Sequence, residues 1–233
     1  MDEFSLRKKT ILVTGANGLI GKEICQALAS RGADLALIDI CNEKNLQSLR
    51  SKIIKKYKVK INTFKCDISN LSQVNSTIKA VIKKFKCIDV LVNLAALDAK
   101  IDALNKNIFN NSFENFPIER WYSSMNVNVN GTFIITKQVL KEMVKKKKGN
   151  IINVASTYSL VSPNHHLYTS KNKKTIYKPI DYVASKSMIP NFTRYIATHY
   201  GRKGIRANVL IPHAIVDKPN KDFLKNFKML SPI

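Results

Sequence analysis

The sequence has no hydrophobic run long enough to cross a membrane. A membrane-spanning helix needs about 18 or more consecutive apolar residues, whereas the 45% of residues that are hydrophobic here fall into short stretches. The N-terminus, MDEFSLRKKTILVTG, also lacks the apolar segment and small-residue cleavage site of a secretory signal peptide. We therefore expect a cytoplasmic protein with no membrane partner.

Cysteine is scarce and scattered. The four residues Cys25, Cys41, Cys66 and Cys87 form no CxxC pair, and no histidine stands at the spacing of a metal site. We expect reduced thiols in or near the core and no bound metal.

Acidic residues are also few, with 16 Asp and Glu against 39 Lys and Arg, which gives a net charge of +23. Such an excess is compatible with nucleic-acid binding. However, only seven of the basic residues are Arg, and the basic residues are spread along the chain. Nucleic-acid surfaces favour the Arg fork and interleave aromatic residues with charge. We favour a solvated basic surface with no nucleic acid bound, and we keep a basic nucleic-acid binder as the weaker alternative.

Short apolar segments alternate with amphipathic ones almost from end to end. The expected strands are Thr10–Thr14, Asp34–Ile38, Lys60–Cys66, Ile88–Leu94, Asn150–Ala155 and Arg206–Ile211, and the expected helices cover residues 19–31, 43–57, 71–86, 118–147 and 181–202. This alternation predicts right-handed crossovers and an α/β fold with a Rossmann-like, doubly wound parallel sheet covered on both faces. With no linker or repeat, residues 1–233 are expected to form a single domain.

Glycine is rare, but three of the eight glycines fall in TGANGLIG, directly after the first expected strand. Glycine there permits a tight turn and lets the backbone approach a phosphate, although a tight turn alone would also require it. The following helix N-terminus offers N–H groups to a pyrophosphate. A dinucleotide site is expected here, formed by Gly15, Asn17, Gly18, Leu19, Ile20 and Gly21.

Two aspartates follow the next two strands. Asp39 can accept hydrogen bonds from both ribose hydroxyls and would repel a 2′-phosphate, which favours NAD over NADP. Its alternative role is only to end the strand. Asp67 could reach the adenine amino group or cap the next helix.

Tyr182 and Lys186 are four residues apart on an expected helix, so their side chains share one face. A phenol has a pKa near ~10, too high for a base at neutral pH, but a nearby ammonium stabilises the phenolate. Such a tyrosine can accept a proton from an alcohol or donate one to a developing alkoxide. The YxxxK spacing is common by chance, but its place after the glycine turn, and after a strand ending at Ser156, favours catalysis.

Taken in this order, these motifs resemble the short-chain dehydrogenase/reductase family over nearly the whole chain. The family's NNAG motif is matched in part by Asn93-Leu-Ala-Ala96, its helix Asn by Asn128 in NVNGTF, and its catalytic Ser by Ser156 in IINVAS. The resemblance implies that Tyr182 is the acid/base, that Lys186 holds the nicotinamide ribose and lowers the Tyr182 pKa, that Ser156 orients the substrate oxygen and that Asn128 supports a proton-relay water. Further nucleotide contacts are implied for Asp67, Ile68, Asn93, Ala95, Tyr182, Lys186 and Pro212.

The implied activity is that of an NAD(P)-dependent oxidoreductase, with NADP less favoured, that interconverts a hydroxyl and a keto group of a small molecule. A homo-oligomer, dimer or tetramer, is implied as well. The long segment after Ser156 is similar to a subgroup found with surface-polysaccharide and flagellin-sugar genes, which suggests a sugar, sugar phosphate or sugar nucleotide as substrate. The side chains that could stack on a pyranose are Tyr158, His165, His166, Tyr168 and Tyr177, and Lys171, Lys173 and Lys174 could contact phosphate. A basic lid without a substrate role fits equally.

The sequence also departs from the family pattern. Its glycine spacing is GxxGxxG, Ala96 replaces the NNAG glycine, and His213 replaces the glycine expected after Pro212. Pro190 is expected to kink the helix that carries Tyr182. The family's last helix and strand have no counterpart in the sequence, which predicts lower stability and a dimer formed through residues 118–147 and 181–202. A catalytically impaired relative that binds nucleotide, or serves as a partner subunit, is the alternative function.

Overall fold

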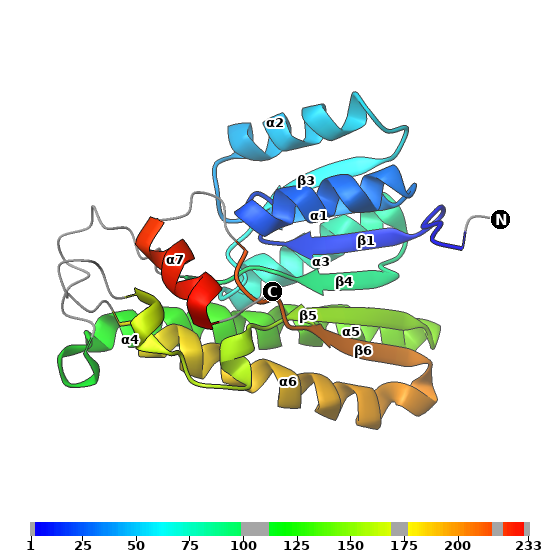
Figure 1. Ribbon diagram of the computed structural model, residues 1–233. Coiled ribbons are helices and arrows are strands. Elements are labelled where there is room, and N and C mark those ends of the chain that lie inside the picture. Colours follow the sequence, from blue (N-terminus) through cyan, green and yellow to red (C-terminus); the bar gives the residue numbers. More distant parts are fainter. Residues whose placement is uncertain (1–2, 99–111, 169–176, 216–220, 231–233) are drawn as a thin grey trace.

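The computed structural model describes residues 3–98, 112–168, 177–215 and 221–230. Their six strands form one parallel sheet in the order β3-β2-β1-β4-β5-β6, with helices on both faces (Figure 1). The strands are β1 (Thr10–Thr14), β2 (Asp34–Asp39), β3 (Ile61–Lys65), β4 (Val90–Asn93), β5 (Gly149–Val154) and β6 (Ile205–Leu210). The α-helices are α1 (Leu19–Ser30), α2 (Glu43–Ile54), α3 (Leu71–Phe85), α4 (Ile118–Met125), α5 (Thr132–Lys146), α6 (Ile180–Tyr200) and α7 (Lys221–Leu230). The expected doubly wound, Rossmann-like fold is confirmed.

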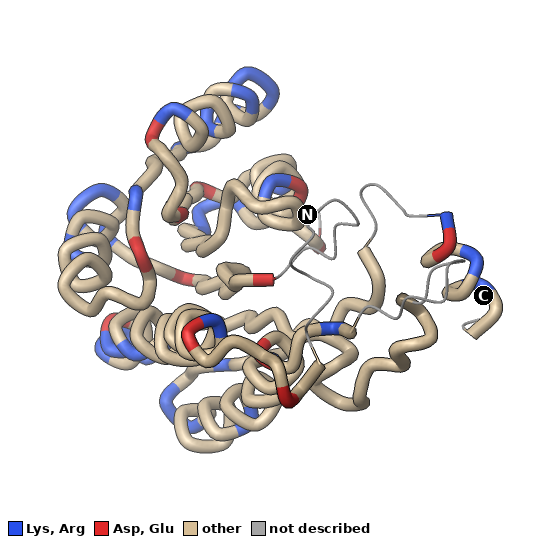
Figure 2. Tube along the Cα trace, turned by 90° about the vertical axis from the view of Figure 1, so that its left-hand side faces the viewer, with Lys and Arg blue, Asp and Glu red and all other residues tan. Residues whose placement is uncertain are grey.

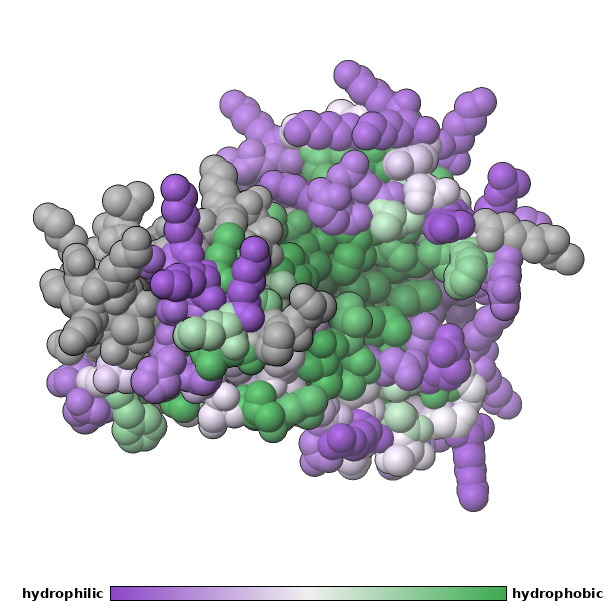
Figure 3. Space-filling model, viewed as in Figure 1, coloured by the Kyte–Doolittle hydropathy of each residue, from purple (hydrophilic) through white to green (hydrophobic). Residues whose placement is uncertain are grey.

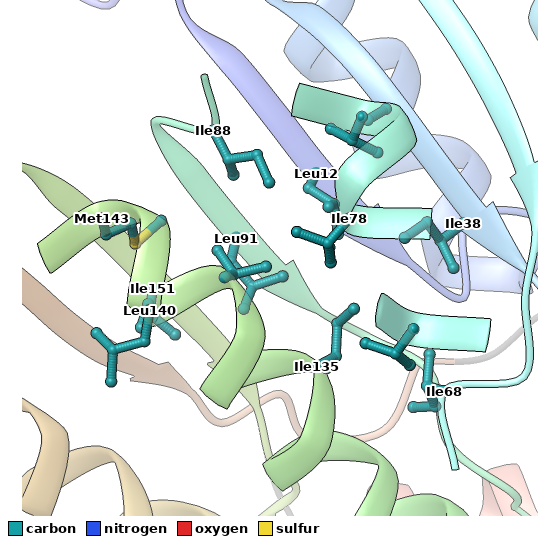
Figure 4. Close-up of a cluster of buried hydrophobic side chains, with 14 of the residues drawn as sticks. Leu12, Ile38, Ile68, Ile78, Ile88, Leu91, Ile135, Leu140, Met143 and Ile151 are labelled. Carbon is teal, nitrogen blue, oxygen red and sulfur yellow. The ribbon is translucent and has the colours of Figure 1, made fainter. Parts of the chain in front are cut away.

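Two apolar layers explain why the strands read as nearly continuous hydrophobic runs. On one face, strand residues such as Leu12, Leu91 and Ile151 are buried under α3 and α5, which contribute Ile78 and Ile135 (Figure 4). The other face buries a second cluster, in which alternate residues of β1 and β2 pack against α1 and α2. Successive side chains of one strand therefore point into opposite layers, and the residues on each side of the strand must be apolar.

The order of the strands places the site. β1 lies between β2 and β4. After β1 the chain continues to α1 on one face of the sheet, whereas after β4 it continues to α5 on the other face. Ligands of open α/β sheets bind outside the carboxyl ends of the strands at such a switch point. The Thr14 hydroxyl joins the two strand ends, because it accepts hydrogen bonds from the backbone N–H groups of Leu94 and Ala95, each at 3.2 Å.

The helix expected over residues 118–147 is continuous in the structure from Ile118 to Lys146, but its winding changes in the middle. The structure has α4, then a π-helical segment, Asn126–Gly131, and then α5. A π segment contains one extra residue in a turn, and such segments are frequent at functional sites. Hydrophobic periodicity cannot show it, because the apolar positions on either side remain helical.

Pro190 lies buried within α6, which is helical on both sides of it. The kink expected there stays a prediction. α7 was not expected at all. Its apolar residues Phe223 and Phe227 are four apart and pack against each other with ring centroids 5.8 Å apart.

Within the described residues, β6 forms one edge of the sheet, and the strand face between α1 and α6 is partly uncovered. Figure 3 shows apolar residues gathered there. Val90 and Ile152 are half-buried, and Leu210 is 49% exposed. None of the described helices combines the length and the apolar character needed to cross a membrane.

Basic residues lie on the outer faces of several helices rather than in one stripe (Figure 2). The cysteines agree with the sequence-based expectation, because Cys25 and Cys66 are buried, Cys41 and Cys87 are half-buried, and all four are free.

Candidate active site

The turn after β1 can only be built with glycine. Gly15 has a φ of +65°, and a Cβ atom there would lie 2.8 Å from the Ala95 backbone. A Cβ atom on Gly21 would lie 2.1 Å from the Gly15 carbonyl oxygen. α1 therefore packs against the turn more closely than any side chain allows, as the glycine motif predicts.

The N-terminus of α1 is open to a ligand. Its N-cap is Gly18, which supplies no side-chain cap, and the first turn has no acidic residue. Leu19, Ile20 and Gly21 are the first residues of the helix, whose N–H groups lie at the positive end of the helix dipole. This arrangement suits a pyrophosphate, whose charge would replace the missing cap.

A pocket of about 290 Å³ opens beside this turn. Seven residues expected to bind the nucleotide line it together: Gly15, Asn17, Gly18, Asp39, Asp67, Ile68 and Ala95. The others expected there, Leu19, Ile20, Gly21, Asn93, Tyr182, Lys186 and Pro212, do not line it. Its shape and its mixture of backbone, carboxylate and apolar groups fit the adenosine half of a dinucleotide.

Asp39 is positioned by backbone groups of two segments. One carboxylate oxygen accepts a hydrogen bond from Asn17 N at 2.9 Å, and the other accepts one from Cys41 N at 3.0 Å. Asp39 is the last residue of β2 rather than a residue beyond it. The carboxylate is therefore fixed at the edge of the pocket, where a ribose would lie.

Asp67 does not cap α3, which settles one alternative. The cap is Asn70, whose side chain accepts a hydrogen bond from Gln73 N. The Asp67 carboxylate accepts instead from the backbone N–H and the hydroxyl of Ser69, at 2.9 and 2.7 Å. It remains at the pocket wall, beside Ile68.

Asn93 is a structural residue in this arrangement. Its side-chain amide is buried and donates to the Thr136 hydroxyl at 2.9 Å and to the Asn153 side chain at 2.8 Å. It ties β4 to β5 and α5, and so supports the loop that carries Ala95.

The expected catalytic side chains meet at the carboxyl end of β5. α6 presents Tyr182 and Lys186 one turn apart, and Ser156 follows β5 directly. The Ser156 hydroxyl is close enough to the Tyr182 phenol to lower its pKa. Lys186 is 6% exposed and donates from Nζ to the Val154 carbonyl at 2.9 Å, with Nζ 5.9 Å from the centre of the Tyr182 ring. The structure thus brings the three residues together as expected.

The pKa of the Tyr182 phenol is raised to about 12, not lowered as expected. Burial is the main cause, the negative charge of Asp98 adds to it, and the hydrogen bond from Ser156 opposes it. Desolvation of the phenolate is thus the dominant effect on this pKa. The phenol is therefore held in its protonated form at neutral pH, poised as an acid.

Asn128 lies in the π segment and is almost wholly buried. Its side chain accepts from Leu97 N at 2.7 Å and donates to the Leu97 carbonyl at 3.0 Å and to the Ser185 hydroxyl at 2.9 Å. It joins the segment after β4 to the catalytic helix. Ser185, which sequence reasoning did not identify, completes this connection.

Several polar residues of the site were missed or only partly foreseen. Lys178 forms an ion pair with Asp98 at 2.8 Å, and its Nζ lies 4.1 Å from the centre of the Tyr182 ring. The hydroxyl groups of Tyr158 and Tyr168 are 2.6 Å apart. Tyr158 and Tyr168 were expected to stack on a sugar, but neither Asp98 nor Lys178 was singled out, since the aspartate and lysine are 80 positions apart.

A second missed cluster anchors the start of α6. The buried Asp181 carboxylate accepts hydrogen bonds from Ser124 of α4 and from the Tyr182 backbone N–H, and Arg120 lies 3.6 Å away.

His213, which follows Pro212, contacts Thr157 at 3.2 Å and packs against Phe227 of α7. The residue that departs from the family pattern after Pro212 therefore links β6 to α7. Lys171, Lys173 and Lys174, expected to contact phosphate, lie outside the described residues.

The buried Lys186 makes stability depend on pH. Burial lowers the pKa of Lys186 from 10.5 to about 8, and Asp98 opposes this shift. Below about pH 8, burying the charged ammonium lowers the free energy of unfolding by roughly 3 kcal/mol. Between about pH 8 and 10.5 the folded state binds fewer protons than the unfolded state. The free energy of unfolding therefore increases as pH rises through this range.

We expect the free energy of unfolding of wild type, relative to Lys186→Met, to increase by about 2 kcal/mol from about pH 7 to about pH 9.5. Urea denaturation of both proteins at both pH values measures this difference. A difference that stays constant with pH would show that the lysine is not desolvated.

Comparisons with known proteins agree with this geometry. A family model described as short chain dehydrogenase matches residues 9–224. A D-threitol dehydrogenase of Mycolicibacterium smegmatis is 29% identical over 231 residues, covering 96% of this chain and 79% of the relative. A 2-dehydro-3-deoxy-D-gluconate 5-dehydrogenase of Bacillus subtilis is 30% identical over 234 residues, covering 96% and 82%.

A flagellin modification protein A of Campylobacter coli is 25% identical over 223 residues, covering 96% of this chain and 83% of the relative, in line with the resemblance noted for the segment after Ser156. Among solved structures, an NAD⁺-bound xylitol dehydrogenase superposes with a TM-score of 0.78, covering 97% of this chain and 76% of that one, at 24% identity. At this identity, the likeness shows the fold alone.

Proposed function

We propose that this chain, which belongs to the short-chain dehydrogenase family, is an NAD-dependent oxidoreductase that interconverts a hydroxyl and a keto group on a small sugar-like molecule. The observation that carries the proposal is the meeting of Ser156, Tyr182 and Lys186 at the end of β5. This group of three residues lies at the same edge of the sheet as the glycine turn and the pocket beside that turn. Relatives named for dehydrogenation of D-threitol and of a sugar acid support this class of substrate.

Tyr182, Ser156 and Lys186 each have a separate role in the proposed reaction. A bound nicotinamide supplies the hydride acceptor or donor. In reduction, the protonated Tyr182 gives its proton to the oxygen that was the carbonyl, and Ser156 donates a hydrogen bond to the same oxygen. In oxidation the proton moves from the alcohol to the Tyr182 phenolate. Lys186, fixed by its hydrogen bond to Val154, keeps further ammonium hydrogens for a ribose and favours the phenolate when oxidation requires it.

Turnover tests this function directly. Purified protein with NAD and a panel of polyols, or with NADH and ketoses, should change nicotinamide absorbance in proportion to substrate consumed. Tight dinucleotide binding without turnover over a broad panel would favour the alternative, a catalytically impaired relative. The unbroken α6 at Pro190 weakens that alternative.

Exposed aromatic residues on α4, α5 and α6, namely Tyr122, Phe133 and Tyr195, fit the proposed homo-oligomer.

The cofactor preference depends on Asp39. We expect NADH to bind at least about tenfold more tightly than NADPH, because a 2′-phosphate would approach a fixed carboxylate. Asp39→Ser should reduce this preference, mainly by improving NADPH binding. Fluorescence titration of both dinucleotides measures it, with Asp67→Asn as a control that leaves the ribose carboxylate in place. Equal affinities in wild type would contradict the prediction.

A further inference from the structure

An ion pair beside the acid/base tyrosine is not used by the chemistry proposed above. Asp98 follows β4, and Lys178 precedes α6. Their Oδ1 and Nζ atoms are 2.8 Å apart; the Lys178 side chain is only 9% exposed, whereas that of Asp98 is 47% exposed. The pair therefore presents its carboxylate to the open side and shelters its ammonium.

The pair lies against the ring of the acid/base tyrosine. The Lys178 ammonium lies 4.1 Å from the centre of the Tyr182 ring. The negative charge of Asp98 raises the pKa of Tyr158, Tyr168 and Tyr182. The hydroxyl pair formed by Tyr158 and Tyr168 thus belongs to the same polar surroundings as the ion pair and Tyr182.

The pair has hydrogen-bonding capacity beyond its own contact. A carboxylate accepts about four hydrogen bonds and an ammonium donates three, and one mutual hydrogen bond uses one of each. A hydroxyl group can both donate to the carboxylate and accept from the ammonium. A negatively charged substrate group could not bind in this way, because Asp98 already neutralises the Lys178 ammonium and would repel a second anion.

We propose that the Asp98–Lys178 ion pair is the subsite that selects an uncharged substrate with a hydroxyl group on the carbon next to the reacting one. This inference rests on the proposed oxidoreductase function and names its substrate class as neutral vicinal diols and hydroxyketones. In oxidation, the carbinol hydride would pass to a bound nicotinamide and the hydroxyl proton to the Tyr182 phenolate. The ion pair binds only the neighbouring hydroxyl and takes no part in either transfer.

Three alcohols that share a carbon skeleton test the proposal: butane-2,3-diol, butan-2-ol and 3-hydroxybutyrate. Wild type should have the highest kcat/KM for the diol and the lowest for the carboxylate. Lys178→Met and Asp98→Asn should each lower the ratio of kcat/KM for diol to that for butan-2-ol by about tenfold or more, mainly through KM, since hydrogen bonds to charged groups are the strong ones.

Two controls separate selection from a structural effect. Lys178→Arg keeps the charge and should retain most of the ratio, and Lys141→Met removes an exposed lysine of α5 and should change nothing. An ion pair that only holds α6 in place would lower kcat/KM for diol and butan-2-ol alike. That result, or a wild type that prefers 3-hydroxybutyrate or butan-2-ol, overturns the inference while turnover upholds the proposed function. No turnover of any alcohol, with dinucleotide bound, overturns the proposed function itself.

Discussion

Tyr182→Phe is expected to lower kcat/KM for every alcohol and ketone by about 10²–10⁴-fold, the range that a positioned general acid or base contributes. The affinity for NADH should stay near that of wild type, because the substitution removes one oxygen and leaves the ring packed beneath Lys178. The protonated phenol is the group able to deliver a proton to the substrate oxygen at neutral pH, since burial raises its pKa to about 12. Steady-state rates and fluorescence titration with NADH measure the two effects separately.

Tyr200→Phe is the matched control for this variant, since Tyr200 lies at the opposite end of the same helix. It should keep wild-type rates. If Tyr182→Phe retained rates within about tenfold of wild type, a different residue would have to supply the proton. The hydroxyl of Ser156 would then be the first to test, because it is near enough to the Tyr182 phenol to affect its pKa.

Gly21→Ala is expected to destabilise the protein by about 2–3 kcal/mol and to weaken dinucleotide binding at least about tenfold. The added Cβ would lie 2.1 Å from the Gly15 carbonyl oxygen, and its other close neighbours are backbone atoms of Ala16. Neither can be relieved by a side-chain rotation, so α1 must move away from the turn. A shift of its N-terminus would displace the N–H groups that face the pyrophosphate site.

Gly201→Ala provides the comparison for this variant, because a Cβ atom there would meet nothing within 4 Å. Thermal unfolding should show a Tm lower by roughly 4–12 °C for Gly21→Ala and little change for Gly201→Ala. Similar Tm values for the two variants would mean that the turn adapts, and that its glycines are needed only for the ligand.

Much of this architecture could be predicted from local patterns in the sequence. The strands are short and apolar on both sides, so their order along the chain implied a doubly wound sheet. Gly15, Asp39 and Asp67 each lie at or just after the end of a strand, and the structure gathers them at one pocket. Tyr182 and Lys186 are held by helical spacing, so their proximity required no knowledge of the tertiary structure.

The rest depends on contacts between distant segments or on a local irregularity. The Asp98–Lys178 pair forms only when the segment after β4 meets the start of α6. The shift in the pKa of Tyr182 went against expectation because the degree of burial is a property of the folded chain. α7 was not expected, and its main contact is with a segment distant in the sequence, the short helix His165–Tyr168, partly through Phe223 and Tyr168.

The π-helical segment Asn126–Gly131 makes the site sensitive to the number of residues as well as to their kinds. Because a π turn accommodates one extra residue between two α-helical segments, removing one residue there would restore regular winding and withdraw the bulged backbone. Asn128, which lies in that turn, would then lose its contacts with Leu97 and Ser185. Mutational surveys that only exchange side chains would overlook this dependence, whereas single-residue deletions walked along the helix would reveal it as a sharp drop in activity at one short stretch.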